Sequence, residues 1–242
     1  MGWSGREEQP VNARGQAGTN FQAGFLVFPG VQLLDLAGPL EVFGLVPGVR
    51  LRLIWKALEL IPSSSGVLLK PSDQLGSCPQ LDLLCVPGGP GIDPLLGDKE
   101  VLEFVRKQAE GVEYLTSVCT GALLLGTAGL LRGYRATTHW SATALLPSLG
   151  ATYQSGRVVE DRNRVTAGGV TAGIDFGLRL VAKIWGEDQA QRVQLRLEYR
   201  PDPPFQAGHP DTAPRRITEQ AEQELATRRE RRAELLRKLL DN

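Results

Sequence analysis

Short apolar runs alternate with longer segments of helical periodicity along most of this 242-residue chain. The apolar runs are the length of β-strands and cover residues 23–28, 81–86 and 112–118, the first two ending at Pro-Gly pairs. Apolar residues recur at helical spacing in residues 31–43, 98–111, 120–131 and 171–185. Strands that alternate with helices predict an α/β fold, in which a mostly parallel sheet lies between layers of helices.

Weaker patterns fill the intervals between these elements. They predict strands at 50–57 and 136–138, a short edge piece at 66–70, a helix at 141–149 and a hairpin around 160–163. Asp98 is the expected N-cap of the helix at 98–111, and Pro39 is expected to kink or restart the helix at 31–43. Ligands of parallel sheets bind beyond the carboxyl ends of the strands, so we expect the functional loops at 28–35, 87–91 and 118–121.

The two ends of the chain differ from its middle. Residues 1–20 are polar and are predicted to form a disordered leader, whereas residues 21–205 are predicted to form one α/β domain. A Pro-rich connector at 201–204 leads to residues 206–242, which are predicted to form a loop and a charged helix at 217–240. We interpret this helix as a solvated tail that packs on its own body or on a second subunit; the pattern leaves its role open.

Composition narrows the possible partners. Lys and Arg number 27, as do Asp and Glu, so no net field attracts nucleic acid or an anionic membrane. No apolar run approaches the length of a membrane span, and the first residues lack a secretory signal, so we expect a cytoplasmic protein. Three cysteines and two histidines, without paired spacing, argue against a disulfide framework and against a metal site.

Cys119 is the foremost candidate for chemistry, because it lies between a predicted strand and a predicted helix in the run Ser117-Val118-Cys119-Thr120-Gly121. The positive end of a helix and its free amides favour a thiolate, which is the attacking form of the side chain. Gly121 would allow the helix to pack closely on the strand, as in a nucleophile elbow. By contrast, Cys85 lies inside an apolar strand and is interpreted as a core residue, and Cys78 has no functional assignment.

Asp35 is the second candidate, because it is an acid in an otherwise apolar stretch just after the first strand. One interpretation is a cap for a helix that begins near Gly38. The alternative, which we favour, is a carboxyl group beside the thiol, with a pKa raised by desolvation so that it can give and take a proton.

Three further positions lie in the same predicted crevice. The amide of Gly88 or Gly89, together with that of Thr120, would form an oxyanion-type hole, and the Thr120 hydroxyl would reach the substrate or Asp35. His139 follows a strand and is expected either to bind substrate in this crevice or to be a structural histidine. Asp175 is interpreted as an acid in the first turn of a helix rather than as a catalyst.

Five motifs in this order resemble those of the ThiJ/PfpI superfamily, a branch of the class I glutamine amidotransferase-like fold, over about residues 23–200. Within it they are most similar to the isonitrile hydratase group. The motifs are Asp35-Leu36-Ala37-Gly38-Pro39-Leu40-Glu41-Val42-Phe43, Val86-Pro87-Gly88-Gly89-Pro90-Gly91, the run around Cys119, Arg135-Ala136-Thr137-Thr138-His139-Trp140, and residues 168–177.

The resemblance implies a flavodoxin-like sandwich, a homodimer, no metal and no organic cofactor. It assigns the nucleophile to Cys119 and acid/base work to Asp35, with help from Thr120. Peptidase-like members carry a histidine directly after the cysteine, so Thr120 argues against proteolysis. Relatives that regulate transcription add a helix-turn-helix module, which one charged helix is too short to supply.

The expected activity is hydration of an isonitrile to an N-substituted formamide through a thioimidate on Cys119, with Asp35 as general acid and base. Two alternatives remain open at this point. One is a glyoxalase- or deglycase-like activity on small carbonyls that uses the same thiol. The other is a non-catalytic redox sensor or ligand-binding module, in which Cys119 becomes oxidised instead of turning over.

Overall fold

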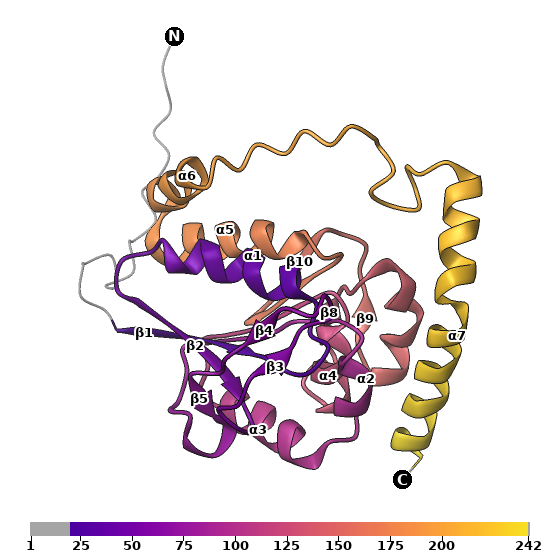
Figure 1. Cartoon of the computed structure of the whole chain (residues 1–242), viewed down its shortest axis with the longest axis horizontal. Helices are drawn as coiled ribbons and strands as arrows, with labels where there is room; N and C mark the ends of the chain where they lie inside the picture. Colours follow the sequence, from indigo (N-terminus) through magenta and orange to yellow (C-terminus); the bar gives the residue numbers. More distant parts are fainter. Residues whose placement is uncertain (1–19, 242) are drawn as a thin grey trace.

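A seven-stranded sheet forms the centre of the protein, which we describe from a computed structural model for residues 20–241 (Figure 1). The strand order is β10-β11-β7-β6-β1-β2-β5, and every neighbouring pair is parallel except β10 and β11. The strands of this sheet are β1 (Phe21–Leu26), β2 (Val49–Trp55), β5 (Asp73–Gln74), β6 (Leu83–Val86), β7 (Tyr114–Val118), β10 (Val158–Asp161) and β11 (Arg164–Ala167). Two short two-stranded sheets pair β3 (Ile61–Pro62) with β4 (Leu68–Leu69) and β8 (Arg135–Ala136) with β9 (Thr152–Tyr153).

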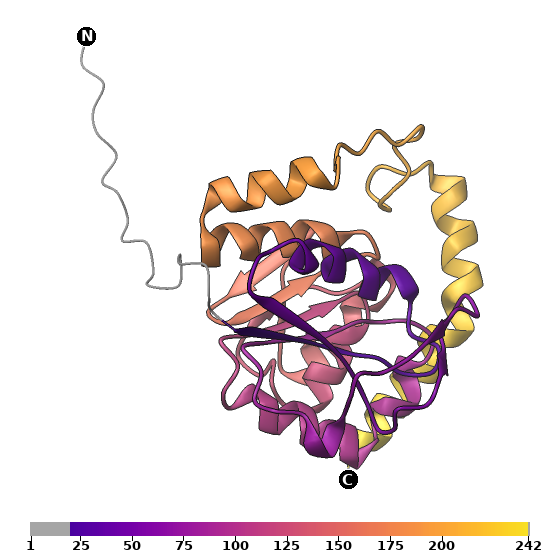
Figure 2. The same ribbon diagram turned by 60° about the vertical axis from the view of Figure 1, so that its left-hand side comes forward.

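Helices cover both faces of this sheet. The α-helices are α1 (Leu33–Gly44), α2 (Ile92–Leu95), α3 (Lys99–Ala109), α4 (Gly121–Thr127), α5 (Ala172–Trp185), α6 (Glu187–Arg196) and α7 (Arg215–Leu240). Helices α1 and α5 pack on one face with α6 stacked outside them, and α3 and α4 pack on the other (Figures 1 and 2). The architecture is a flavodoxin-like α/β sandwich, as predicted.

Alternation along the buried strands divides the core into two layers. In β1 every residue is buried; Ala23 and Phe25 point toward α1 and α5, whereas Leu26 joins the opposite layer. In β6 the side chain of Cys85 lies in the α1 and α5 layer and is fully buried. A strand buried on both faces needs apolar side chains at every position, which is why these strands read as continuous apolar runs.

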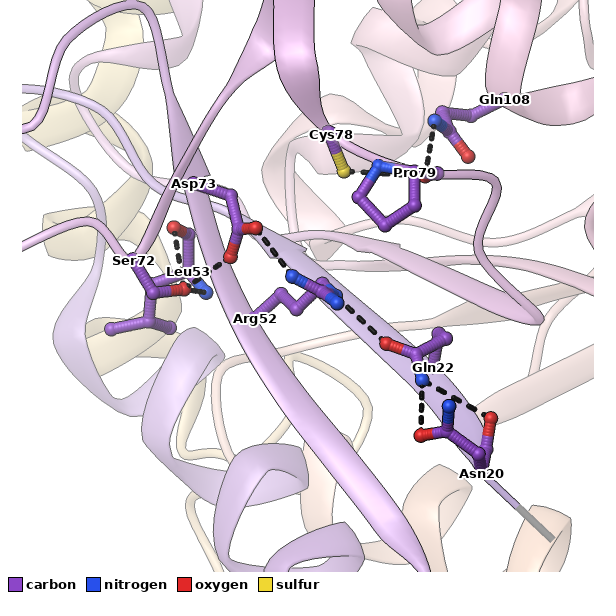
Figure 3. Close-up of polar contacts among 9 residues, drawn as sticks. All are labelled: Asn20, Gln22, Arg52, Leu53, Ser72, Asp73, Cys78, Pro79 and Gln108. Atoms are coloured by element: carbon purple, nitrogen blue, oxygen red, sulfur yellow. Dashed lines mark hydrogen bonds and ion pairs between the residues drawn. The ribbon is translucent and has the colours of Figure 1, made fainter.

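Polar side chains join three strands near the amino end of β1 (Figure 3). Arg52 of β2 donates a hydrogen bond to Gln22 of β1 (2.8 Å) and forms an ion pair with Asp73 of β5. Gln22 in turn donates to the side chain of Asn20 (2.5 Å). These contacts fasten the very short edge strand β5 to the sheet, and we call Gln22, Arg52 and Asp73 the amino-end network.

Most of the predicted elements are present, with boundaries that shift by a few residues. Asp98 caps α3 by accepting a hydrogen bond from the amide of Val101, and the hairpin of β10 and β11 turns at Arg162. Pro39 lies inside an uninterrupted α1, so it does not restart the helix. The helix at 217–240 is confirmed as α7, and its burial of Leu236 shows that it packs on its own body.

Three predictions were wrong in detail. Residues 141–149 form two 3-10 helices, Trp140–Leu145 and Pro147–Leu149, because Pro147 prevents a continuous α-helix. The helix at 120–131 ends at Thr127, where Gly129 adopts a positive φ. The piece at 66–70 pairs with β3 outside the main sheet, and α2, α6, β3 and β5 were not predicted.

Two further expectations concern the start of the chain and membrane-spanning helices. The leader predicted for residues 1–20 lies outside the described residues except for Asn20. Among residues 20–241, no helix combines the length and apolar character that a membrane span requires.

Candidate active site

Cys119 stands on a strained turn between β7 and α4. Its φ is +55°, in the left-handed region that residues other than glycine rarely adopt. The surrounding chain holds this turn: the Cys119 amide donates to the carbonyls of Ala167 (3.0 Å) and Gly168 (2.9 Å), and the hydroxyl of Thr138 donates to the Cys119 carbonyl (2.7 Å). The side chain is only 7% exposed. The predicted elbow is therefore present.

Gly121 allows α4 to begin against the neighbouring strand. A Cβ atom at this position would lie 2.0 Å from the carbonyl oxygen of Val86, the last residue of β6. Only glycine permits this approach, which confirms the packing role predicted for Gly121.

Asp35 reaches the same place from α1. Helix α1 is fixed over the sheet by apolar contacts such as Phe43 with Phe176 of α5, whose ring centroids are 6.4 Å apart. The carboxyl group of Asp35 is completely buried; its Oδ2 accepts a hydrogen bond from the Gly88 amide (2.9 Å). Its Oδ1 has no hydrogen-bond partner among the described residues. Since α1 begins at Leu33, Asp35 lies within the helix and does not cap it.

The two titratable groups affect each other. Burial raises the pKa of Asp35 from 3.8 to about 7, although hydrogen bonds from Gly88 and Cys119 oppose that rise. Burial and the nearby Asp35 charge raise the pKa of the Cys119 thiol, against hydrogen bonds from Thr120 that lower it. Burial thus opposes the expected effect of the helix N-terminus, and the pKa of the Cys119 thiol lies above its ordinary value.

Gly88 and Gly89 follow β6, the strand between those that lead to Cys119 and Asp35. Their amides were expected to point toward substrate as an oxyanion-type hole. Instead the Gly88 amide donates to Asp35, and the Gly89 amide donates to the hydroxyl of Thr120 (3.1 Å). The loop therefore holds the catalytic candidates in position, and its amides are not free in this structure. A Cβ atom at Gly88 would lie 2.6 Å from the amide nitrogen of Thr120, so a larger residue does not fit.

His139 has a structural contact and also faces a cavity. Its Nδ1 accepts a hydrogen bond from the Ser141 amide (3.3 Å) and lies 2.8 Å from the Ser141 hydroxyl, so it caps the 3-10 helix Trp140–Leu145. Burial and the charge of Arg232 lower the pKa of His139. A neutral imidazole that accepts at Nδ1 carries its proton at Nε2.

The cavity beside His139 has a volume of about 530 Å³. Its walls include Thr138 and Gly168, two of the three residues described above that hydrogen-bond to the backbone of Cys119. The side chains of Cys119 and Asp35 are not among its lining residues, so they lie behind this wall. Sequence reasoning missed Thr138 and Gly168 as supports of the nucleophile, although both lie within recognised motifs.

The other residues considered from the sequence lie outside the site. Asp175 is in the first turn of α5, as its structural interpretation predicts, and it forms an ion pair with Arg157. Cys85 is a core residue, with a pKa raised by burial to about 12. Cys78 lies near the amino-end network, where its thiol donates to the carbonyl of Pro79 (Figure 3). Within residues 20–241, no three His, Cys, Asp or Glu side chains are grouped to hold a metal ion.

Comparison with known proteins agrees with this arrangement. Residues 22–183 match the model of the DJ-1/PfpI family. The chain is 52% identical over 214 residues to isonitrile hydratase from Pseudomonas putida, and the match covers 88% of this chain and 94% of that protein.

Solved structures give the same result for the fold. A ThiJ/PfpI family protein from Pseudomonas syringae superposes with a TM-score of 0.89 at 39% identity, covering 96% of this chain and 97% of the other. DJ-1beta from Drosophila melanogaster superposes with a TM-score of 0.67 at 20% identity, covering 76% and 100%, which shows a common fold. On the family match and these likenesses together, the chain belongs to the DJ-1/PfpI family.

Proposed function

We propose that this protein hydrates isonitriles to N-substituted formamides, with Cys119 as nucleophile and Asp35 as general acid and base. The observation that carries the proposal is the buried pair of an acid with a pKa of about 7 and a thiol beside it. Isonitrile hydration needs one proton to move from a nucleophile to a carbon atom, and later from water to a leaving group. The 52% identity with an isonitrile hydratase supports this choice of substrate.

The first half of the reaction forms a thioimidate. The Asp35 carboxylate accepts the proton of the Cys119 thiol, and the sulfur attacks the terminal carbon of R–N≡C. The protonated Asp35 then delivers the proton to that carbon, which gives Cys119–S–CH=N–R. The hydrogen bonds that Thr120 directs at the sulfur stabilise the negative charge that develops there.

The second half consumes one water molecule. The Asp35 carboxylate accepts a proton from water as its oxygen attacks the thioimidate carbon, and this proton passes to the nitrogen. Breaking the C–S bond then releases R–NH–CHO, and the hydroxyl proton returns to sulfur through Asp35. The sum is R–N≡C plus water giving the formamide, with Cys119 and Asp35 restored.

Cys119→Ala tests this assignment. With cyclohexyl isocyanide as substrate, we expect turnover to fall by a factor on the order of 10⁴ or more, because nucleophile and proton donor are both removed. Cys85→Ala is the matched control, since it removes a buried thiol of the same layer outside the site and should retain turnover. Normal turnover by Cys119→Ala would refute the proposal.

Substrate choice separates this activity from the two alternatives. We expect formamide formation from an isonitrile and no comparable consumption of methylglyoxal, which a glyoxalase-like enzyme would consume. Reversible sulfenylation of Cys119 by mild peroxide, without hydration of any isonitrile, would favour the redox sensor instead.

The homodimer implied by the resemblance stays a prediction, as does the cytoplasmic location. Exposed apolar side chains around β3 and β4 support the dimer, because a second copy would cover them: Leu58, Leu60, Val67 and Leu68. Light scattering on the purified protein should give twice the mass of the chain. Leu68→Lys should shift the mass toward that of one chain if this face is the interface.

A further inference from the structure

Helix α7 carries one buried charged side chain. Within residues 215–240 only Arg232 and Leu236 are buried, and Arg232 is 4% exposed. A guanidinium removed from water is costly unless it is paired. The Nε of Arg232 donates to Oδ1 of Asp93, 2.5 Å away in α2. The charge that α7 buries is therefore directed at this short helix.

Helix α7 contacts α2 near both of its ends. Asp93 lies in the first turn of α2, and Leu239 of α7 lies against Gly97, just after its last turn. The side chains of Ile92 and Leu95 fix the other face of α2 in the core. Figure 1 shows α7 running beside the domain next to α2. The position of α2 thus depends on α7 on one side and on the core on the other.

Helix α2 continues directly from residues 88–91, which we call the Gly88 loop. The amide of Ile92, the first residue of α2, donates to the carbonyl of Gly89 (3.2 Å). The amide of Gly91 donates to the carbonyl of Gly30 (3.1 Å), which ties the loop to the chain that leads into α1. A shift of α2 would therefore move the loop with it.

The Gly88 loop in turn holds the reacting groups. The Gly88 amide donates to Oδ2 of Asp35, and the Gly89 amide donates to the hydroxyl of Thr120. Thr120 also directs hydrogen bonds at the sulfur of Cys119. An unbroken series of contacts thus leads from α7 through α2 and the loop to the acid and the nucleophile. Small displacements of reacting groups have large effects on rate.

Arg232 also affects the segment that follows another motif of the site. Its positive charge is one cause of the lowered pKa of His139. Helix α7 contacts the 3-10 helix Trp140–Leu145, which His139 caps. The guanidinium group is therefore close to two of the segments that build the site.

We propose that Arg232 is a positioning residue: through its ion pair with Asp93 it fixes α2 and the Gly88 loop, and so keeps the acid and the nucleophile aligned. The inference rests on the proposed function for the reaction that this alignment serves. Buried ion pairs often add less stability than apolar residues of similar volume, whereas they do fix one geometry. Such a role explains why a helix with a largely exposed surface buries an arginine.

Arg232→Met tests the proposal, because it keeps a long side chain but removes the ion pair. With cyclohexyl isocyanide, we expect kcat to fall about tenfold and KM to change less than about twofold. The hydrogen bond from Gly88 lowers the pKa of Asp35, so a displaced loop should raise it. The midpoint of the pH profile of kcat/KM should therefore move up by about half a unit.

The titratable neighbours of Asp35 are the thiols of Cys119 and Cys85, and both remain in this variant. Arg231→Met, at the exposed preceding residue, is the matched control and should retain the kcat and the pH midpoint of the wild type. Arg232→Lys keeps a positive charge for Asp93 and should recover most of kcat.

A double variant guards against misfolding. Arg232→Met leaves Asp93 without its partner, whereas Arg232→Met/Asp93→Asn removes both charges of the pair. Both should lose kcat to the same extent, because either change breaks the same interaction. Urea unfolding is measured in parallel. If the variants lose only stability, with kcat per folded molecule and the pH midpoint at the wild-type values, the pair is merely structural and the inference fails.

A titration without substrate separates this inference from the proposed function. Aspartate labelled at its carboxyl carbon is followed by NMR over a range of pH, and Asp35→Asn assigns the resonance of Asp35. We expect its midpoint to lie about half a unit higher in Arg232→Met than in the wild type. An unchanged midpoint would overturn the inference even in an active enzyme. A raised midpoint in a protein that hydrates no isonitrile would refute the proposed function alone.

Discussion

The two ends of the same sheet treat polar groups in opposite ways. In the amino-end network, Gln22, Arg52 and Asp73 join three strands from the amino end of β1 to the edge strand β5, and each finds a partner of complementary charge or hydrogen-bonding capacity. At the carboxyl end, Asp35 is buried with one oxygen unpartnered and Cys119 adopts an unfavourable φ. The amino end favours stability, whereas the carboxyl end sacrifices stability for reactivity.

This difference shows which part of the fold is destabilised by the groups that it holds. A buried carboxyl group with a raised pKa is held in an environment that disfavours its charge. That environment is the same one that allows the group to exchange a proton near neutral pH. Removing the reactive acid should therefore lower activity and raise stability. Breaking the amino-end network should instead lower stability and leave activity unchanged.

Among the variants that test this contrast, Asp35→Asn should have the largest effect. Turnover should fall by about 10³, because Asn cannot carry the proton between thiol and carbon. Stability should rise: the folded protein binds the Asp35 proton more tightly than the unfolded chain, so wild-type stability falls as pH rises from 3.8 to about 7 and stays lower above it.

The size of that gain has a ceiling. The interval from 3.8 to about 7 corresponds to about 4 kcal/mol at most. Urea unfolding at pH 5 and pH 8 measures it, and the pH dependence of stability should be flatter in the variant. An Asp35→Asn protein that is less stable than wild type at pH 8 would contradict the contrast between the two ends.

Gly88→Ala should have the next largest effect. Its Cβ atom would lie 2.6 Å from the amide nitrogen of Thr120 and 3.0 Å from Oδ2 of Asp35, so it would push apart the groups that the loop aligns. We expect roughly a 100-fold loss of kcat/KM. Gly76→Ala is a matched control, because a Cβ atom there meets nothing within 4 Å. Circular dichroism should show that both variants fold.

The pH profile of the wild-type protein gives a smaller effect. Below pH 7 a second proton binds to the acid–thiol pair, so kcat/KM should fall about tenfold for each further pH unit and level off above pH 7. Initial rates with cyclohexyl isocyanide at constant ionic strength measure this. A decline that begins only near pH 4 would mean that Asp35 behaves as an ordinary carboxyl group.

The smallest effect on activity is expected from Arg52→Met at the amino end. Loss of the ion pair with Asp73 and of the bond to Gln22 should lower the free energy of unfolding by about 1–3 kcal/mol, because a half-buried carboxylate loses its partner. Activity per folded molecule should stay at the wild-type level. A clear loss of activity at a temperature where the variant is folded would show that the two ends are coupled.

Sequence patterns predicted those elements of the fold whose own residues carry a clear apolar pattern. β1, β6 and β7 are buried on both faces and therefore form apolar runs that need no tertiary knowledge. The edge strand β5 has two residues and depends on Arg52 for its place, so its own sequence carries little signal. Helix α6 has a low apolar content and buries only Ala190 and Val193, which explains why it was not predicted.

The candidate site was predictable in position but not in its electrostatics. The rule for parallel sheets placed Asp35, the Gly88 loop and Cys119 at one edge, where the structure has them. The acceptors of the Gly88 and Gly89 amides depend on the spacing between loops to within an ångström, which sequence does not give. The same holds for the thiol, whose protonation depends on depth of burial.

The clamp on the Cys119 backbone has a consequence for dynamics. Turn residues usually exchange their amide hydrogens with solvent quickly, because their hydrogen bonds open locally. The Cys119 amide instead donates to two carbonyls, and its residue is almost fully buried. We therefore expect this amide to exchange as slowly as those in the middle of β7, so that the reactive turn opens only when the whole sheet does.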